Sequence, residues 1–241
     1  MLLQLLSRFA LLPEQAARWF APEKREKAGI KATDADIIQN PYRVAELDTG
    51  GREALPVSLG VIDRGLLPDS APANRFPIPE PSFVGSPRDP RRIRAAIVAV
   101  LRQAAADGDS LLVADESVRR VSALGLRPDP DVTLDWIHGN SERLEGVVES
   151  VELPVTEGQP GVPALQLTPL KEREDWLRRN LLARARRRLD SFEQDWASLL
   201  RESIGPNAEI NDAALAEQAE ALERVTTSKL SLLLGRAGTG K

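Results

Sequence analysis

Apolar positions recur at helical spacing through most of the chain, and this pattern predicts a mainly α-helical protein. The opening leucines fit one helix face. Pro13 suits the first turn of a second helix, because the amide hydrogen that proline lacks would be unpaired there. Thr33 stands where an N-cap is expected, and Asn40–Pro41 ends the short helix that follows. We therefore predict a helical region over residues 1–67.

A proline-rich segment, residues 68–90, interrupts this pattern. It contains seven prolines and shows no periodicity, which indicates an extended linker or an arm laid over a neighbouring surface. The arm is favoured by apolar residues that a freely solvated linker would not need: Phe76, Ile78, Phe83 and Val84.

Three helices and two strands are expected over residues 91–168. The first helix begins at Pro90 and ends at Gly108, the second ends near Gly125, and a third follows around Leu134. The segments VESVELPV and PALQLT, separated by a turn-rich stretch, predict a β-hairpin. Three helices followed by a hairpin is the element order of a winged-helix module.

The remaining chain is predicted to be helical and then to enter an α/β domain. Residues 169–210 read as a helical connector that is broken around residues 189–191. Residues 211–241 read as the start of a RecA-like domain, with a helix from Asp212 and a buried strand over residues 230–234.

Composition narrows the possible chemistry. The chain has no cysteine and one histidine, so thiolate and multi-histidine metal sites are excluded, and we name no metal ligand; carboxylate-only magnesium binding stays open. The formal net charge of -4 gives no global attraction to nucleic acid, so any such contact needs a local basic patch. No stretch approaches the roughly 20 apolar residues of a membrane span. We expect a soluble, cytoplasmic protein without a membrane partner.

The strongest motif is GRAGTGK at residues 235–241, which has the G-x-x-x-x-G-K spacing of a phosphate-binding loop. Its glycines allow successive N–H groups to point inward and form a nest for anionic oxygens, and Lys241 supplies a positive charge for the outer phosphates. The Ser or Thr that completes this Walker A pattern would be residue 242, so we expect a truncation within the motif. The predicted ATP-binding residues are Gly235, Arg236, Ala237, Gly238, Thr239, Gly240 and Lys241, with Lys241 also the catalytic residue.

The stretch AEQAEALERVTTSKLSLLLGRAGTGK resembles the entry to the first motor domain of RecD-like superfamily 1 DNA helicases, relatives of the exodeoxyribonuclease V alpha subunit. Gln218 falls at the position that reads adenine in that family, or it is an ordinary solvent-facing side chain. Upstream, the IIQNPYRVAEL segment with Asn40, Pro41 and Tyr42 is similar to the helix-hairpin-helix-like N-terminal region of the same family, and residues 91–168 have a winged-helix counterpart there.

The resemblance implies the N-terminal accessory region of an ATP-dependent 5'-3' DNA helicase that serves DNA repair or recombination. In the full-length protein, ATP and Mg²⁺ would bind between two RecA-like domains, and hydrolysis would drive movement along single-stranded DNA. Residues 1–241 alone are not expected to hydrolyse ATP. The alternative is a non-catalytic module that binds DNA or a partner protein, attached to a P-loop NTPase that is not a helicase.

Two groups of arginines are further candidates. One lies in RRNLLARARRR and is either a solvated helix balanced by upstream acids or a DNA contact; its members are Arg178, Arg179, Arg184, Arg186, Arg187 and Arg188. The other opens the helix that begins at Pro90 and is either an ordinary exposed first turn or a phosphate contact; its members are Arg91, Arg92 and Arg94.

The aromatic residues and the histidine are predicted to be structural. The tryptophans lie at apolar positions of separate helical segments, which favours core anchoring over base stacking; they are Trp19, Trp136, Trp176 and Trp196. His138 has no suitable partner nearby in the sequence, and no catalytic role is expected for it.

Overall fold

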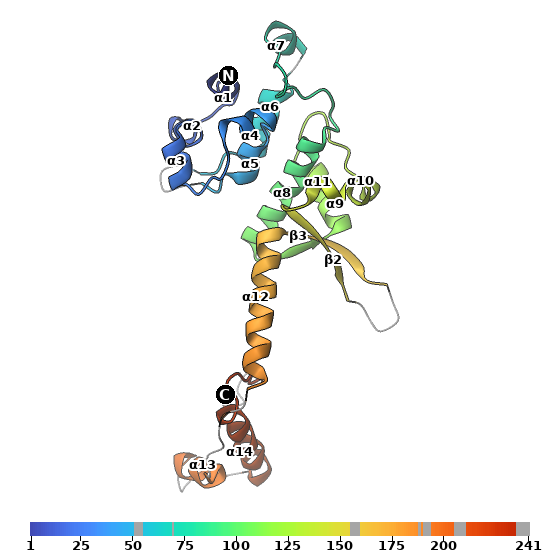
Figure 1. The fold of residues 1–241 in the computed structure, drawn as a ribbon. Helices are drawn as coiled ribbons and strands as arrows, with labels where there is room; N and C mark the ends of the chain where they lie inside the picture. The colour runs from blue at the N-terminus through green and yellow to red at the C-terminus, as the bar shows by residue number, and fades with distance from the viewer. Residues whose placement is uncertain are drawn as a thin grey trace. The chain divides into compact units, whose positions relative to one another are not determined.

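The computed structural model describes residues 1–50, 55–68, 70–154, 160–187, 189, 194–204 and 211–234. The chain forms two compact units, residues 1–171 and 172–241. The described residues are mainly helical and contain one three-stranded antiparallel sheet (Figure 1). This confirms the predicted fold class at the level of a mainly α protein with a small antiparallel β element. None of the described helices is long and apolar enough to cross a bilayer.

Short helices fill the N-terminal part of the first unit. Their bounds are α1 (Leu2–Leu6), α2 (Pro13–Phe20), α3 (Pro22–Lys27), α4 (Asp34–Gln39), α5 (Arg43–Leu47) and α6 (Leu59–Leu66). Thr33 caps α4 as the sequence predicts: its hydroxyl accepts from the Asp36 N–H at 3.2 Å, and its own N–H donates to the Asp36 carboxylate at 2.7 Å. Pro13 occupies the first turn of α2, again as predicted.

The proline-rich segment contains a helix that the sequence did not predict, α7 (Ser70–Arg75). Beyond α7, Ile78 and Val84 are buried, whereas Phe76 and Phe83 are exposed. The Ser82 hydroxyl donates to the Ile38 carbonyl, at the end of α4, at 2.8 Å. This part of the segment therefore lies along the N-terminal helices as a bound arm.

Helix α8 (Pro90–Asp107) is the central element of the first unit. Its N-terminus is capped by Asp89, and it ends at Gly108, whose φ of 102° favours glycine because a side chain would be strained there. Helices α5 and α6 contact α8, and so do α9 (Ala114–Ala123), α11 (Ser141–Leu144) and two strands of the sheet. Figure 1 shows α8 between the N-terminal helices and the sheet.

The sheet has the strand order β1-β3-β2, formed by β1 (Leu111–Val113), β2 (Val148–Leu153) and β3 (Val162–Leu167). Strands β2 and β3 are the predicted hairpin, with Val148 opposite Leu167 and Leu153 opposite Val162. Strand β1 was missed because three residues leading straight into α9 give almost no alternating signal. Helix α10 (Leu134–Gly139) contacts α9, and α11 contacts β2.

One apolar core runs through the whole first unit. It begins with Leu2 in α1, includes Trp19 and Ile62 from the N-terminal helices and Ile97 from α8, and reaches Leu165 in β3. The helical region 1–67 and the predicted winged-helix-like region 91–168 thus share a single core. Trp19 is fully buried, in line with its predicted role as an anchor.

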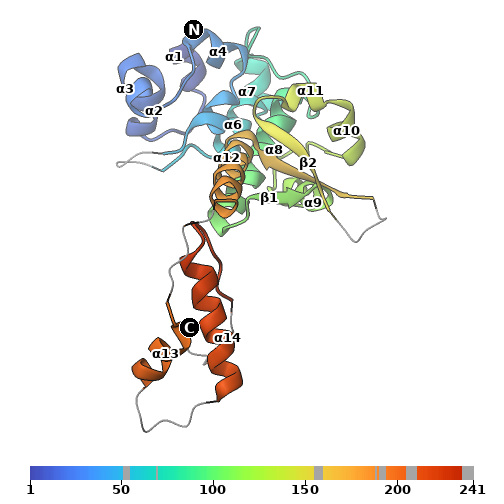
Figure 2. The same cartoon turned by 60° about the horizontal axis from the view of Figure 1, so that its bottom comes forward.

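The second unit is helical in its described residues. Helix α12 (Thr168–Ala185) begins just before the boundary between the units, and α13 (Trp196–Ile204) and α14 (Asp212–Thr226) follow and contact each other (Figure 2). Arg201 in α13 pairs with Asp212 at 2.8 Å. Asn211 caps α14 by accepting from the Ala213 and Ala214 N–H groups. Helix α12 ends at Ala185, four residues before the predicted break at residues 189–191, of which residues 190 and 191 lie outside the described residues.

The strand expected over residues 230–234 is wrong. These residues have no strand conformation, and their leucines are exposed, with Leu232 at 82% and Leu234 at 81%. A buried strand needs neighbours that satisfy its backbone N–H and C=O groups, and the described part of the second unit offers no sheet for it to join. An apolar run can suggest a strand, but it cannot supply the partner strand.

Candidate functional site

The predicted nucleotide site falls at the edge of what the structure describes. Gly235 to Lys241, including the predicted catalytic lysine, lie outside the described residues. Gln218, the predicted adenine reader, is exposed on α14, one turn after the buried Leu215. It makes no hydrogen bond to any described residue, so its side chain is accessible from solvent.

Of the arginines that open α8, Arg92 is buried and Arg91 and Arg94 are partly buried, and all three are bound to groups of the first unit rather than exposed together. Arg92 is fully buried and binds Asp63 of α6 through two hydrogen bonds, Nε to Oδ1 at 2.7 Å and Nη2 to Oδ2 at 2.9 Å. Its remaining donors reach the carbonyls of Pro87 and Pro128 at 2.9 and 2.6 Å. The Tyr42 hydroxyl donates to the same Asp63 carboxylate at 2.8 Å. This cluster joins α6, α8 and the start of α5, and it is a structural centre without access for phosphate.

The other two arginines of this group are engaged in a similar way. Arg94 binds Glu46 of α5 through two hydrogen bonds of 2.9 and 2.6 Å. Arg91 donates to the Asp89 carboxylate and to backbone carbonyls of Gln39, Pro81 and Phe83. It therefore fastens the proline-rich arm to the beginning of α8.

Charge states in this region follow from these contacts. Burial, reinforced by the adjacent Asp63 carboxylate, raises the pKa of Tyr42. For Asp48, burial acts to raise the pKa, but hydrogen bonds from Arg18 and from the N–H groups of Val57 and Gly50 outweigh it, and the pKa is lowered. The raised pKa keeps Tyr42 neutral as a hydrogen-bond donor, and the lowered pKa keeps Asp48 ionised as an acceptor. Such shifts are typical of a structural hydrogen-bond network.

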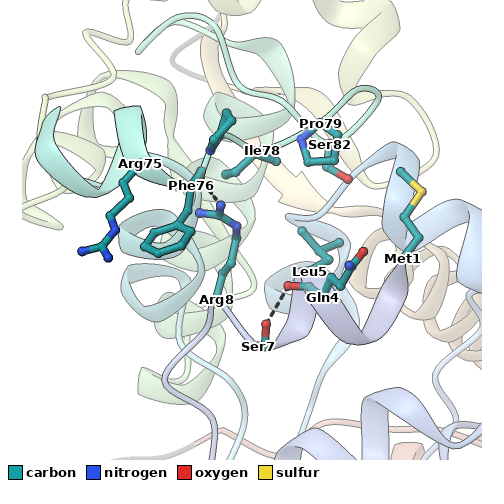
Figure 3. A pocket seen from close by; sticks show the side chains of 11 residues that line it. Met1, Gln4, Leu5, Ser7, Arg8, Arg75, Phe76, Ile78, Pro79 and Ser82 are labelled. Atoms are coloured by element: carbon teal, nitrogen blue, oxygen red, sulfur yellow. Dashed lines mark hydrogen bonds between the residues drawn. The ribbon is translucent and has the colours of Figure 1, made fainter.

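A pocket of about 620 Å³ lies between α1 and the arm (Figure 3). Arg8 donates to the Phe76 carbonyl, and the guanidinium carbon of Arg75 lies 5.3 Å from the centre of the Phe76 ring. The Ser7 and Ser82 hydroxyls that line it donate to backbone carbonyls. Its basic groups are thus occupied by the arm itself, and its lining includes no carboxylate, histidine or lysine that could act in acid–base catalysis.

The outer face of α10, α11 and β2 is acidic. A hollow of about 570 Å³ in this face is lined by Glu142, Glu145 and Glu149 together with His138. Asp135 lies nearby on α10, and the basic side chain in these two helices besides His138 is Arg143. A surface with this balance repels phosphate groups and is unsuited to gripping a nucleic-acid backbone.

The basic residues of α12 are arranged in the opposite way. Every side chain from Trp176 to Arg187 is exposed, and this stretch contains five arginines and no acid. The arginines form no ion pair with any residue in the described part of the chain. Trp176 is 58% exposed, so its predicted role as a core anchor is wrong. The sequence did contain a signal for this surface, because no acidic residue lies between Asp175 and Arg187. The prediction from helical spacing did not use it.

Comparisons with known proteins identify no relative. No protein-family model matches the sequence, and neither curated proteins nor solved structures gave a match. Across the described ranges there is also no group of three or more acidic or histidine side chains placed to hold a metal ion.

Proposed function

We propose that residues 1–241 are the N-terminal accessory region of a RecD-like, ATP-dependent 5'-3' DNA helicase. The observation that carries the proposal is the G-x-x-x-x-G-K spacing at residues 235–241, reached through a helix that bears Gln218. In the full-length protein this loop would hold the phosphates of ATP, and Lys241 would neutralise charge on the β and γ phosphates. Magnesium would be held by residues beyond Lys241.

The topology of the first unit supports a winged-helix-like module in this region. The order α8, β1, α9, α10, α11, β2, β3 and the sheet order β1-β3-β2 resemble those of a winged helix, with the short α11 as an addition. In such a module α10 and the turn between β2 and β3 are the usual contacts to DNA. Here α10 and its surroundings are acidic, so we assign the module a role in positioning neighbouring parts rather than in gripping DNA.

The same acidic face favours a second candidate function. A module with three glutamates around a hollow suits a basic protein partner, so the chain could serve as a non-catalytic protein-binding module attached to a different P-loop NTPase. The two candidates differ in whether ATP hydrolysis depends on DNA.

The deciding experiment is an ATPase assay on the full-length protein with and without single-stranded DNA. A helicase is expected to hydrolyse ATP faster when DNA is present, and Lys241→Ala should abolish this activity. Lys229→Ala removes another exposed lysine of the same unit and serves as the matched control, with unchanged activity expected. If the rate of ATP hydrolysis does not change with DNA, or if Lys241→Ala remains active, the helicase proposal is rejected and the second candidate is favoured.

Gln218 provides a separate test of the resemblance. If its amide reads adenine, Gln218→Ala should raise the KM for ATP several-fold and weaken the preference for ATP over GTP, with little change in kcat. Glu217→Ala, at the neighbouring exposed position on α14, is the control. If the KM and the nucleotide preference are unchanged, Gln218 is a solvent-facing helix residue with no role in ATP binding.

A further inference from the structure

The second half of α12 is an exposed basic surface with an aromatic residue beside it. From Trp176 to Arg187, two residues beyond the end of α12, there are five arginines, no acidic residue and no buried side chain. Exposed side chains at Leu177, Leu181 and Leu182 add apolar area. A helix that is exposed on all sides is unusual unless something covers part of it.

The positive charge of this surface is free to act on a ligand. The arginines of α13 and α14 are neutralised: Arg201 pairs with Asp212, and Arg224 pairs with Glu220. In contrast, Arg178, Arg179 and Arg184 meet no carboxylate of the described chain. Three acids, Glu172, Glu174 and Asp175, precede this stretch in α12, but no acid lies between Trp176 and Arg187, so this part of the surface stays net positive even though the whole chain carries a formal charge of -4.

The arrangement of these residues along the helix places the aromatic ring next to positive charge. Trp176 and Arg179 are three residues apart and lie on the same face. Successive helical residues are separated by about 100°, so Arg184 lies about 80° from Trp176 around the helix and Arg178 about 160° from it, toward the opposite side. Leu177 and Leu181, four residues apart, form a separate apolar strip. The indole of Trp176 and the guanidinium of Arg179 are thus presented together, Arg184 lies to one side of them, and Arg178 extends the positive charge around the helix.

We propose that the second half of α12 binds single-stranded DNA, with phosphates at Arg178, Arg179 and Arg184 and an unpaired base stacked on Trp176. Charge complementarity selects a polyanion, and the exposed indole selects an unstacked base, because base–aromatic stacking is a main source of affinity for single strands. An acidic protein surface would need the charge but not the aromatic ring. This inference rests on the proposed helicase function, which is the reason for choosing DNA as the polyanion.

The test measures binding of residues 1–241 to fluorescent oligo(dT) as a function of salt. The triple variant Arg178→Gln/Arg179→Gln/Arg184→Gln removes three candidate phosphate contacts and keeps good helix formers. Each lost contact should reduce the slope of log K against log salt by about 0.7, so a reduction of about 2 is expected together with a large loss of affinity at low salt. Far-UV circular dichroism should remain unchanged because these side chains are exposed.

A matched control removes the same number of charges from ion-paired arginines. The variant Arg119→Gln/Arg201→Gln/Arg224→Gln changes positions that pair with Glu116, Asp212 and Glu220, and it should bind oligo(dT) like the original chain. Trp176→Ala should weaken binding by roughly tenfold and leave the salt slope unchanged, since stacking carries no net charge.

Three results of the binding assay would each overturn the proposal. They are equal losses in the α12 variant and the control variant, no binding of oligo(dT) at low salt, and displacement of oligo(dT) by an acidic peptide at equal charge concentration. The last result would identify a protein partner instead. Because the assay contains no nucleotide, its outcome is separate from that of the Lys241→Ala test. DNA-stimulated ATP hydrolysis with no effect of the α12 variant would keep the helicase and reject this surface.

Discussion

Arg92 and Asp63 form a buried, bidentate ion pair that joins α8 to α6, with Nε–Oδ1 and Nη2–Oδ2 distances of 2.7 and 2.9 Å. Both side chains are almost completely shielded from water. The pair ties the short N-terminal helices to the helix that carries the sheet. It also explains why an arginine in the first turn of α8 points inward.

Removing one partner of this pair is expected to destabilise the first unit strongly. Arg92→Met leaves the Asp63 carboxylate buried without its cation and should lower the free energy of unfolding by about 3–5 kcal/mol. Chemical denaturation monitored by far-UV circular dichroism measures this change. Arg119→Met, which breaks an exposed pair with Glu116, should leave the denaturation midpoint nearly unchanged. Equal effects of the two substitutions would contradict a structural role for the buried pair.

The single tyrosine offers a spectroscopic view of the same cluster. Burial and the Asp63 carboxylate raise the pKa of Tyr42 above its ordinary value of 10.0, so the folded protein disfavours the phenolate. The stabilisation is complete below that ordinary value and is lost as the pH rises through it, because only the unfolded chain then releases the proton. We expect the phenolate absorbance to appear together with alkaline unfolding. A separate phenolate transition near pH 10, before unfolding, would argue against the contact.

Asp48 predicts an effect at acidic pH. Its lowered pKa stabilises the folded state above the ordinary value of 3.8, and this contribution is lost as the pH falls below that value toward the folded pKa. Asp48→Asn should therefore be less stable than the original chain at neutral pH, with the difference shrinking toward pH 3. Urea titrations over this range provide the measurement, and Asp135→Asn, at an exposed position, is the control. A pH-independent difference would assign the loss to packing instead.

Gly65 and Gly60 make a matched pair within α6. A β-carbon at Gly65 would lie 2.5 Å from the Phe9 ring and 2.8 Å from the Arg8 carbonyl, whereas one at Gly60 would meet nothing closer than the Arg64 side chain at 3.9 Å. We expect Gly65→Ala to lower the stability by about 1–3 kcal/mol through overpacking. Gly60→Ala should raise it by about 0.5–1 kcal/mol through helix propensity. Thermal unfolding distinguishes the two, and equal shifts would mean that Arg8 and Phe9 are not in close contact with α6.

The first unit is expected to fold without the second. All residues of the continuous apolar core lie between Leu2 and Leu165, so residues 1–171 retain the burial that stabilises this unit. A chain ending at Lys171 should unfold cooperatively, with a Tyr42 environment like that of the whole chain. Loss of the cooperative transition would show that residues beyond 171 are needed for stability.

The sequence by itself determined most of the helices and the hairpin. The Thr33 cap, the Pro13 and Pro90 starts and the Gly108 end act through neighbouring backbone atoms, and the alternation in β2 and β3 reflects their local burial. Such signals can be read from a few consecutive residues. They also led to the error at residues 230–234, where an apolar run lacks a sheet to join.

The tertiary structure decided which charged and aromatic residues are available for function. Arg92 and Arg179 look alike in the sequence, but Asp63, 29 residues before Arg92, neutralises one, and no described carboxylate pairs with the other. Trp19 and Trp176 both occupy apolar helical positions, and only the first meets a core. Burial and pairing depend on groups that are distant along the chain, so the local pattern could not separate a buried, paired arginine from an exposed one that no described carboxylate pairs.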